Sequence, residues 1–355
     1  NAPDGVRICY ATVGEGPPLV KAPNWLSHLV YDWSSPVWRH WWQELSRDHR
    51  LVRYDQRCCG LSDWSAEDLS LEAWVRDLEA VVDAVELESF PLLGVSQGGV
   101  AAVEYAVRHP ERVSHLILYG SYARGRSRRG LTSEEREEGE AIEVLMRQGW
   151  GRDNPAYRQI FTSRFIPGAT LEQMAWFNDL QRASCSAENA VRIRRSWGEL
   201  DILDRVTQVR VPTLVLHARD DAAVPFGEGR LLASLIPGAE FVPLEGQNHI
   251  LLEDEPAWPR FLSEVRQFLG LEPVESPQAG NIIEAARDYP DGLTQREVEV
   301  LCLLASGKTD REIAQELTIS VGTASTHVRN LLNKTNSANR TEAAAYATAQ
   351  GLFKR

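Results

Sequence analysis

The segment FPLLGVSQGGVAAVEYAVRH, residues 90–109, constrains the fold of this chain more than any other stretch. An apolar run comes first, the pattern Gly-x-Ser-x-Gly follows, and a helical pattern completes the segment. A strand turns this sharply into a helix where glycines allow the backbones to cross closely, which we expect of Gly94 and Gly98. The segment therefore predicts that Ser96 is a nucleophile at the tip of a strand–turn–helix unit, with the Gln97 N–H stabilising a developing oxyanion.

Short apolar runs alternate with helical patterns around this segment, which is typical of an α/β fold with a parallel sheet. The predicted strands are Leu19–Ala22, Leu51–Tyr54, Pro91–Gly94, His115–Tyr119, Thr213–His217 and Glu240–Leu244. Between the fourth and fifth of them, residues 121–205 show helical patterns, which predicts an inserted helical cap. Two charge runs in this insertion, RGRSRRG and SEEREEGE, are typical of solvated surface.

The predicted cap is rich in large apolar side chains. We expect a ligand pocket beneath it, lined by Asn24, Trp25, Trp150, Trp176 and Trp197. The alternative for each aromatic residue is that it only packs the cap onto the sheet. Eleven tryptophans in the chain favour a lipophilic or aromatic ester, lactone or diketone as the ligand.

Two loops supply the partners that a serine nucleophile needs. A serine hydroxyl becomes reactive when a histidine accepts its proton and a carboxylate orients that histidine. The segment LVLHARDDAAVPF offers Asp220 and Asp221 after one predicted strand, and EGQNHILLEDEP offers His249 after the next. The order serine, acid, histidine at successive strand ends predicts a Ser-Asp-His triad, with either aspartate as its acid.

With these motifs in place, residues 5–270 resemble the α/β-hydrolase family, including its helical cap. In that family the acid usually stands four residues before a proline, so the resemblance selects Asp221, which precedes Pro225, and leaves Asp220 as the alternative. The Gly-x-x-His loop of the family is matched by Gly246 and His249.

The chain departs from the family pattern after the third strand of the family. Many relatives carry His-Gly there, where a backbone N–H completes the oxyanion hole, but this chain reads APNWLSHL. The resemblance implies that Trp25 or Leu26 supplies this N–H beside Gln97, since a backbone donor tolerates any side chain. The bulk of Trp25 makes a wall of the ligand pocket the alternative role for that residue.

The last part of the chain, residues 291–355, contains four helical patterns. A capping-box pattern at Thr294 and Glu297 begins the first, Gly307 ends it, and the fourth spans about 340–349. The second and third, joined by LTIS, form a helix-turn-helix pattern. The motifs LTQREVEVL, ASGKTDREIAQEL and ISVGTASTHVRNLLNK closely resemble the LuxR-type family of DNA-binding domains.

This second resemblance implies double-stranded operator DNA as a partner. The residues it assigns to the DNA-contacting surface are Lys308, Thr309, Thr323, Ser325, Thr326, Arg329 and Lys334. Gly322 and Ser325 stand where relatives often carry lysine, which implies weaker non-specific binding and greater reliance on a homodimer. The fourth helix commonly supplies the dimer contact, and EAAAYA, residues 342–347, has small residues for close packing.

Composition sets limits on compartment and partners. The formal net charge is −12, yet residues 291–355 carry eight Lys and Arg against seven Asp and Glu, so this part is +1 and the remainder −13. A strongly acidic N-terminal part joined to a near-neutral C-terminal part is typical of a chain whose two parts have different functions. Five cysteines without metal-ligand spacing indicate reduced thiols and a cytoplasmic protein, with no metal or cofactor expected. The sequence lacks an apolar run of about 18 residues, so we expect no membrane partner.

The predicted organisation is a hydrolase-fold domain over residues 1–272 with a cap over about 121–205, a linker over 273–290, and a small all-α four-helix domain over 291–355. Three functions are compatible with it. The first is a transcriptional regulator whose hydrolase-fold domain binds a small-molecule ligand. The second is an active serine hydrolase with an accessory DNA-binding module. The third combines them, with slow hydrolysis of the ligand resetting the regulator.

Overall fold

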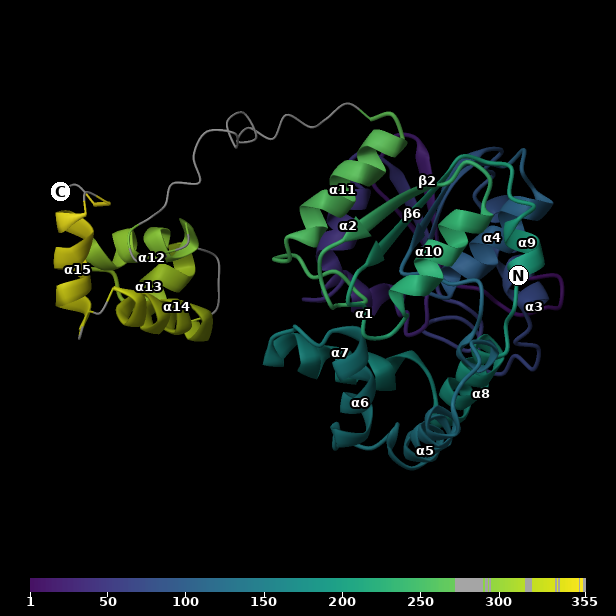
Figure 1. The fold of residues 1–355 in the computed structure, drawn as a ribbon, viewed down its shortest axis with the longest axis horizontal. Coiled ribbons are helices and arrows are strands. Elements are labelled where there is room, and N and C mark those ends of the chain that lie inside the picture. Colours follow the sequence, from purple (N-terminus) through teal and green to yellow (C-terminus); the bar gives the residue numbers. More distant parts are fainter. Residues whose placement is uncertain are drawn as a thin grey trace. The chain divides into compact units, whose positions relative to one another are not determined.

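The computed structural model describes residues 1–271 and, in the C-terminal part, residues 290, 293, 295–316, 321–335, 337, 339–350 and 352–353. The chain divides into two compact units, Asn1–Pro273 and Val274–Arg355 (Figure 1). Apart from residue 290, the predicted linker over 273–290 lies outside the described residues.

A seven-stranded sheet in the order β1-β3-β2-β4-β5-β6-β7 forms the centre of the first unit. Its strands are β1 (Tyr10–Val13), β2 (Pro18–Ala22), β3 (Arg50–Tyr54), β4 (Phe90–Val95), β5 (Val113–Tyr119), β6 (Thr213–Ala218) and β7 (Glu240–Leu244). Edge strand β1 pairs antiparallel with β3, and every other pairing is parallel. The predicted α/β-hydrolase fold is therefore confirmed, with one antiparallel strand added at its edge.

Helices cover both faces of the sheet, which explains why its central strands are continuous apolar runs. They are α1 (Leu29–Trp33), α2 (Arg39–Leu45), α3 (Leu71–Ala84), α4 (Gly98–Arg108), α9 (Leu203–Val206), α10 (Phe226–Leu235) and α11 (Ala257–Phe268). On one face α2 packs on α11 (Figure 1). There the centre of the Trp41 ring lies 5.0 Å from that of Trp258 and 4.8 Å from that of Phe261. Helices α3, α4, α9 and α10 pack side by side on the other.

A group of helices inserted between β5 and β6 forms the cap, and Figure 1 shows it gathered at one end of the sheet. It consists of the short η1 (Arg126–Arg128), then α5 (Ser133–Gly149), α6 (Ala156–Phe165), α7 (Leu171–Ser184) and α8 (Ala187–Gly198). Capping boxes at Thr132 and Thr170 fix the starts of α5 and α7. The carbonyl of Phe165, at the end of α6, accepts hydrogen bonds from the His249 and Ile250 N–H groups at 2.8 and 3.2 Å. The cap is thus tied to the loop after β7.

The second unit is a bundle of α12 (Gln295–Ala305), α13 (Asp310–Glu316), α14 (Val321–Lys334) and α15 (Arg340–Ala349). The predicted small helical domain is confirmed. Its core includes Leu301, Ile313 and Leu331, and Val298 and Leu332 pack against this core as partly buried residues. Thr294, predicted to cap the first helix of this domain, lies outside the described residues.

Helix α15 uses part of its small-residue face inside this unit. Ala343 and Ala347 are fully buried in the bundle core, while Ala345 is exposed. Close packing of the predicted dimer contact is therefore limited to the face of α15 that carries Ala345.

The pH dependence of stability is expected to reflect a buried histidine of α2. Burial lowers the pKa of His40 from 6.5 to about 4, although the hydrogen bond from its Nε2–H to the Leu251 carbonyl (3.0 Å) opposes this shift. The folded chain binds fewer protons here than the unfolded chain, so the free energy of unfolding falls as the pH drops from about 6.5 towards 4. The full effect is roughly 3 kcal/mol.

Urea unfolding between pH 4 and 7, followed by tryptophan fluorescence, measures this dependence. His40→Gln retains a donor for the Leu251 carbonyl but does not titrate, so the variant is expected to show a shallower slope over this range. Equal slopes for the two proteins would assign the pH dependence to other groups.

Candidate active site

The turn after β4 holds Ser96 in a strained backbone conformation. Its φ angle is +54°, a value that residues with a side chain rarely adopt, and its N–H donates to the Tyr119 carbonyl at 2.8 Å. A Cβ on Gly94 would lie 2.4 Å from the Gly99 Cα, and one on Gly98 would lie 2.6 Å from the Pro23 carbonyl oxygen. The glycines of GVSQGG are therefore required by close backbone crossing, and the strand–turn–helix geometry is that of a nucleophile elbow.

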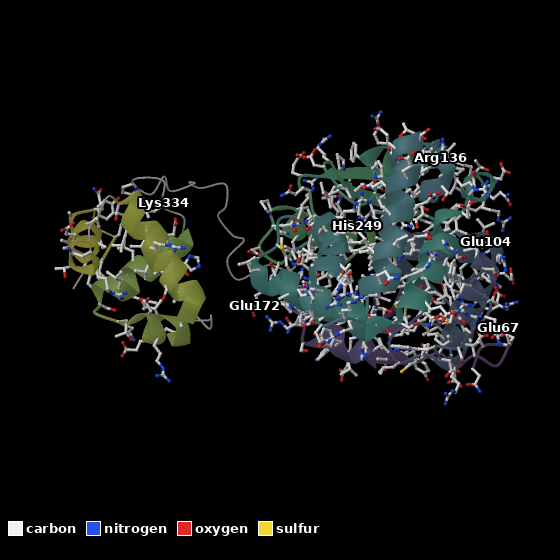
Figure 2. All side chains as sticks on the ribbon, turned by 90° about the horizontal axis from the view of Figure 1, so that it is seen from below. Glu67, Glu104, Arg136, Glu172, His249 and Lys334 are labelled. Atoms are coloured by element: carbon white, nitrogen blue, oxygen red, sulfur yellow. The ribbon has the colours of Figure 1, made fainter. Side chains whose placement is uncertain are left out.

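Asp221 and His249 form a buried hydrogen-bonded pair. His249 Nδ1 donates to Asp221 Oδ2 at 2.7 Å, and both side chains are at most 1% exposed. Figure 2 shows His249 among the side chains of the first unit. The other carboxylate oxygen accepts from the Ala223 and Val224 N–H groups, each at 2.8 Å. Asp220, the alternative acid, is exposed at the surface. The structure thus pairs His249 with Asp221.

Electrostatics keep the Asp221 carboxylate charged. Burial by itself would raise the pKa of Asp221, but the nearby His249 and His217 rings, the His249 hydrogen bond and the backbone donor Val224 together hold it below its usual value. Because the charged carboxylate accepts from Nδ1–H, Nε2 of His249 carries the lone pair. Within the described residues this nitrogen makes no hydrogen bond, and His249 lines the same cavity as Ser96.

Sequence reasoning missed the supporting role of His217, at the end of β6. Its Nε2–H donates to the Val224 carbonyl at 3.0 Å and lies 3.5 Å from Asp221 Oδ2. Burial lowers the pKa of His217, which favours the neutral ring. The residue therefore braces the turn that carries Asp221. A histidine inside the otherwise apolar run LVLHA was the signal that could have identified it.

Two of the three predicted oxyanion-hole residues line the same cavity as Ser96. They are Trp25 and Gln97, and Leu26 adopts a φ of +64° in the same loop as Trp25. Within the described part of the chain, the backbone N–H groups of these three residues donate no hydrogen bond. They remain available to an oxyanion, as the prediction requires.

Asn24, predicted to line the ligand pocket, does not line the cavity that contains Ser96. It is buried, it accepts a hydrogen bond from the Lys21 ammonium, and its amide donates to the Trp25 carbonyl at 2.9 Å. Burial lowers the pKa of Lys21 to about 7, while burial raises that of nearby Asp32 to about 7. Asn24 thus holds the loop that carries Trp25 through its hydrogen bond to the Trp25 carbonyl, and its side chain does not line the cavity.

One cavity of about 1020 Å³ contains Ser96 and His249 in its wall. Of the predicted pocket residues, Trp25 and Trp197 line it, but Trp150 and Trp176 do not. Trp150 stacks on Trp25 at 6.0 Å and donates its Nε1–H to the Cys185 carbonyl at 3.0 Å. Trp176 stacks on Tyr31 at 4.9 Å. For Trp150 and Trp176 the packing alternative is therefore correct.

The charge runs of the cap also contribute to the cavity wall. The charged residues of SEEREEGE are exposed, as expected of solvated surface, whereas Arg124, Arg126 and Arg129 of RGRSRRG are partly buried. The charged members of both runs that line the cavity are Arg124, Arg126, Arg129, Glu135, Arg136, Glu138 and Glu140. The cavity therefore has an aromatic part beside Ser96, formed by Trp25 and Phe165, and a charged part formed by the cap.

Two family models match separate parts of this chain. The alpha/beta hydrolase fold model matches residues 25–138, and the model for bacterial regulatory proteins of the luxR family matches residues 291–347. This chain joins an α/β-hydrolase-fold domain to a LuxR-type domain.

Individual proteins resemble one or the other domain. The AB hydrolase superfamily protein YisY of Bacillus subtilis is 26% identical over 252 residues, covering 69% of this chain and 89% of YisY. The transcriptional regulatory protein LiaR of the same organism is 42% identical over 80 residues, covering 21% of this chain and 38% of LiaR. An esterase structure from Exiguobacterium antarcticum superposes with a TM-score of 0.63 at 23% identity, covering 76% of this chain and 97% of the esterase, which supports the fold.

The LuxR-type domain implies DNA binding. Its described lysine and arginine side chains differ in whether they already form an ion pair within the domain. Arg329 is exposed on α14 and makes no ion pair within the described residues. Lys308 pairs with Glu316, and Lys334 lies 2.8 Å from Glu297. DNA phosphates would have to displace these two glutamates. Of the three predicted cationic DNA contacts, Arg329 is the one with no ion pair within the described residues.

Of the uncharged residues predicted to contact DNA, two form hydrogen bonds within the domain and two have side chains outside the described residues. Thr309 caps α13, with its N–H donating to Glu312 at 2.8 Å and its hydroxyl accepting from the Glu312 N–H at 3.4 Å. Ser325 is exposed and donates its hydroxyl to Asp310 at 2.6 Å. The side chains of Thr323 and Thr326 lie outside the described residues. In the regions that the structure describes, no helix is long and apolar enough to span a membrane.

Proposed function

We propose that this protein is a ligand-responsive transcriptional regulator. Its hydrolase-fold domain binds a small ester- or lactone-like molecule in the cavity beside Ser96 and slowly hydrolyses it, and its LuxR-type domain binds operator DNA as a homodimer in the cytoplasm. The observation that carries this proposal is a Ser96–His249–Asp221 constellation, open to a large cavity, in a chain that also carries a LuxR-type domain.

The geometry supports acyl transfer at this site. Ser96 would attack a carbonyl carbon, His249 Nε2 would accept its proton, and Asp221 would hold the imidazole in the required tautomer. The Gln97 N–H and either Trp25 or Leu26 would stabilise the oxyanion. Water would then release the acid, returning Ser96 to its starting state. An enol-lactonase from Burkholderia xenovorans shares the fold, with a TM-score of 0.61 at 23% identity, covering 75% of this chain and 98% of the lactonase.

The hydrogen bonds between the cap and the His249 loop support a link between cavity and signal. The Phe165 carbonyl accepts from His249 N–H, and Asn248 accepts from the Gly168 N–H at 2.8 Å. A ligand that binds one cap arrangement more tightly than another shifts the population towards it. The second candidate function is an active serine hydrolase with an accessory DNA-binding module, and the same triad favours it.

Ligand-dependent operator binding distinguishes the two functions. Operators are selected from a random duplex pool with the purified chain, and small esters and lactones are screened by the shift in unfolding temperature. Fluorescence anisotropy then measures operator affinity with and without each hit. A regulator is expected to change its operator affinity when ligand binds. Unchanged affinity with rapid turnover of the same compounds would favour the hydrolase.

Two variants separate sensing, chemistry and DNA contact in this assay. Ser96→Ala is expected to keep the response if binding alone is the signal and to make it permanent if hydrolysis resets it. Arg329→Ala is expected to lose about 1–3 kcal/mol of operator binding and to retain ligand binding. Full operator affinity in Arg329→Ala would contradict the assignment of Arg329 to the DNA-contacting surface.

A further inference from the structure

The cavity wall holds seven arginines and six glutamates, one arginine more than its glutamates can neutralise. At three places a pair of arginines shares one glutamate: Arg124 and Arg129 on Glu228, Arg126 and Arg164 on Glu138, and Arg194 and Arg195 on Glu143. All of these residues line the cavity that contains Ser96. One carboxylate balances one guanidinium, so each place carries an excess of positive charge.

The pair that shares Glu228 is the most informative. Arg124 binds Glu228 Oε1 at 2.7 Å, whereas Arg129 lies 4.0 Å from the same oxygen. The Arg129 Nε–H donates instead to the Arg124 carbonyl at 2.8 Å, and its guanidinium lies 4.9 Å from the centre of the Tyr122 ring. Within the described residues, its two terminal nitrogens make no hydrogen bond. Arg129 therefore presents an unused guanidinium fork.

The position of Tyr122 relates this fork to the triad. Tyr122 lies two residues beyond Gly120, where a Cβ would come within 2.9 Å of His249 Cε1. The Tyr122 ring supports the Arg129 guanidinium, and Tyr122, Arg129 and His249 all line the cavity. A ligand held at Arg129 is therefore in the same cavity as Ser96.

Burial makes the excess charge costly without a counter-ion. The Arg129 side chain is only 14% exposed, and that of Arg194 is 17% exposed. Burial lowers the pKa of both guanidinium groups, and for Arg194 the neighbouring Arg126 and Arg164 lower it further while Glu143 opposes them. Like charges gathered in a partly desolvated wall attract an anion of matching shape.

We propose that the ligand of this cavity is a carboxylate-bearing ester or lactone. Its acyl part lies beside Trp25 and Phe165 near Ser96, and its free carboxylate binds the arginine wall, with Arg129 as the principal contact. A planar guanidinium matches a carboxylate through two parallel hydrogen bonds, which a neutral ester cannot reproduce. This inference rests on the proposed ligand-binding function of the cavity and replaces the purely lipophilic ligand expected from tryptophan content.

The test compares two probes in the full chain carrying Ser96→Ala, which cannot turn them over. Monoethyl adipate carries one carboxylate, and diethyl adipate is its neutral counterpart of similar length. Isothermal titration calorimetry is expected to show the monoester binding at least ~10-fold more tightly, in keeping with a charge-assisted bidentate contact. Raising the salt concentration from about 0.05 to 0.5 M is expected to reduce this preference.

Arginine variants locate the effect. Arg129→Gln, added to Ser96→Ala, is expected to weaken monoester binding ~10-fold and diester binding less than ~2-fold. Arg194→Gln is the second variant and is expected to weaken the monoester selectively in the same way. The matched control is Arg260→Gln on α11, an exposed arginine outside the cavity wall that pairs with Glu264, and it should change neither affinity.

Three results would overturn the inference: equal or tighter binding of the diester, no measurable binding of the monoester at about 10 mM, or an unchanged monoester preference in both arginine variants. These results are distinct from a failure of the proposed function. A wild-type chain without hydrolytic activity leaves the binding preference of Ser96→Ala intact. Equal probe affinities overturn only the anionic ligand class and leave Ser96 labelling and the operator response standing.

Discussion

Replacing Ser96 by alanine is expected to abolish covalent labelling of the chain by a fluorophosphonate and to lower ester hydrolysis by roughly three to six orders of magnitude. Labelling requires a serine oxygen activated by His249, whose Nδ1–H is held by Asp221 at 2.7 Å. His249→Ala is expected to have a comparable effect, because no other group of the triad accepts the serine proton. Intact-protein mass spectrometry measures labelling, and initial rates with 4-nitrophenyl butyrate measure hydrolysis.

The two neighbouring aspartates provide a matched control for this prediction. Asp221→Asn is expected to lower hydrolysis by about 10⁴-fold, since an amide stabilises the wrong tautomer of His249. Asp220→Asn changes an exposed carboxylate one residue away and is expected to leave the rate within a factor of two of wild type. Labelling that persists in Ser96→Ala would contradict the nucleophile assignment. Equal losses in the two aspartate variants would contradict the choice of Asp221.

The fold and the elbow could be predicted because their signals are local. Strand β4, the glycines of GVSQGG and helix α4 are contiguous, and the backbone crossing at Gly94 and Gly98 depends on those few residues. The ends of β6 and β7 likewise bring the Asp221 and His249 loops to the same edge of the sheet, because parallel strands end together.

The lining of the cavity could not be predicted in the same way, because it depends on how the cap helices pack. Trp150 and Arg129 both stand in a segment with helical patterns, yet Trp150 stacks on Trp25 while Arg129 lines the cavity. A run of charged residues in a sequence does not reveal which of those residues line a cavity. Polar residues inside buried strands, such as Lys21 in β2 and His217 in β6, were the available signals that sequence reasoning passed over.

The LuxR-type domain shows a similar limit. Its helices follow from capping and periodicity, but the pairing of Lys334 with Glu297 joins α14 to α12 across the bundle. Such pairs decide which cations are free for phosphate, and they depend on tertiary structure. Arg329 is accordingly a better candidate for contact with DNA than Lys308 or Lys334.

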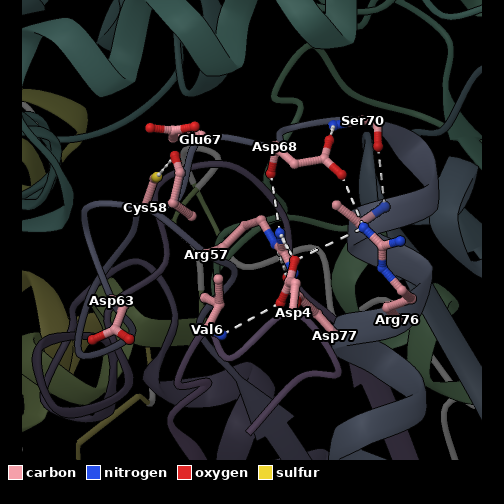
Figure 3. A network of polar contacts seen from close by, with 12 residues as sticks. Asp4, Val6, Arg57, Cys58, Asp63, Glu67, Asp68, Ser70, Arg76 and Asp77 are labelled. Carbon is pink, nitrogen blue, oxygen red and sulfur yellow. Dashed lines mark hydrogen bonds and ion pairs between the residues drawn. The ribbon is translucent and has the colours of Figure 1, made fainter.

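A second large effect, on the free energy of unfolding, is expected from replacing Arg57, a buried arginine that follows β3. Arg57 is fully buried and forms a bidentate pair with Asp77, with contacts of 2.9 and 2.6 Å (Figure 3). It also binds Asp4 at 2.8 Å and the Asp68 carbonyl at 3.1 Å. Arg57→Met is expected to lower the free energy of unfolding by about 3–5 kcal/mol, because Asp77 would remain buried without a counter-charge.

Urea unfolding followed by tryptophan fluorescence measures this loss in the first unit alone, since all eleven tryptophans precede residue 259. The double variant Arg57→Met/Asp77→Leu removes both charges and is expected to recover much of the stability lost in Arg57→Met. Arg7→Met breaks an exposed pair with Asp63 and serves as the control, with an unchanged unfolding midpoint expected. A double variant no more stable than Arg57→Met would mean that Arg57 acts through its contacts with Asp4 and Asp68 rather than by neutralising Asp77.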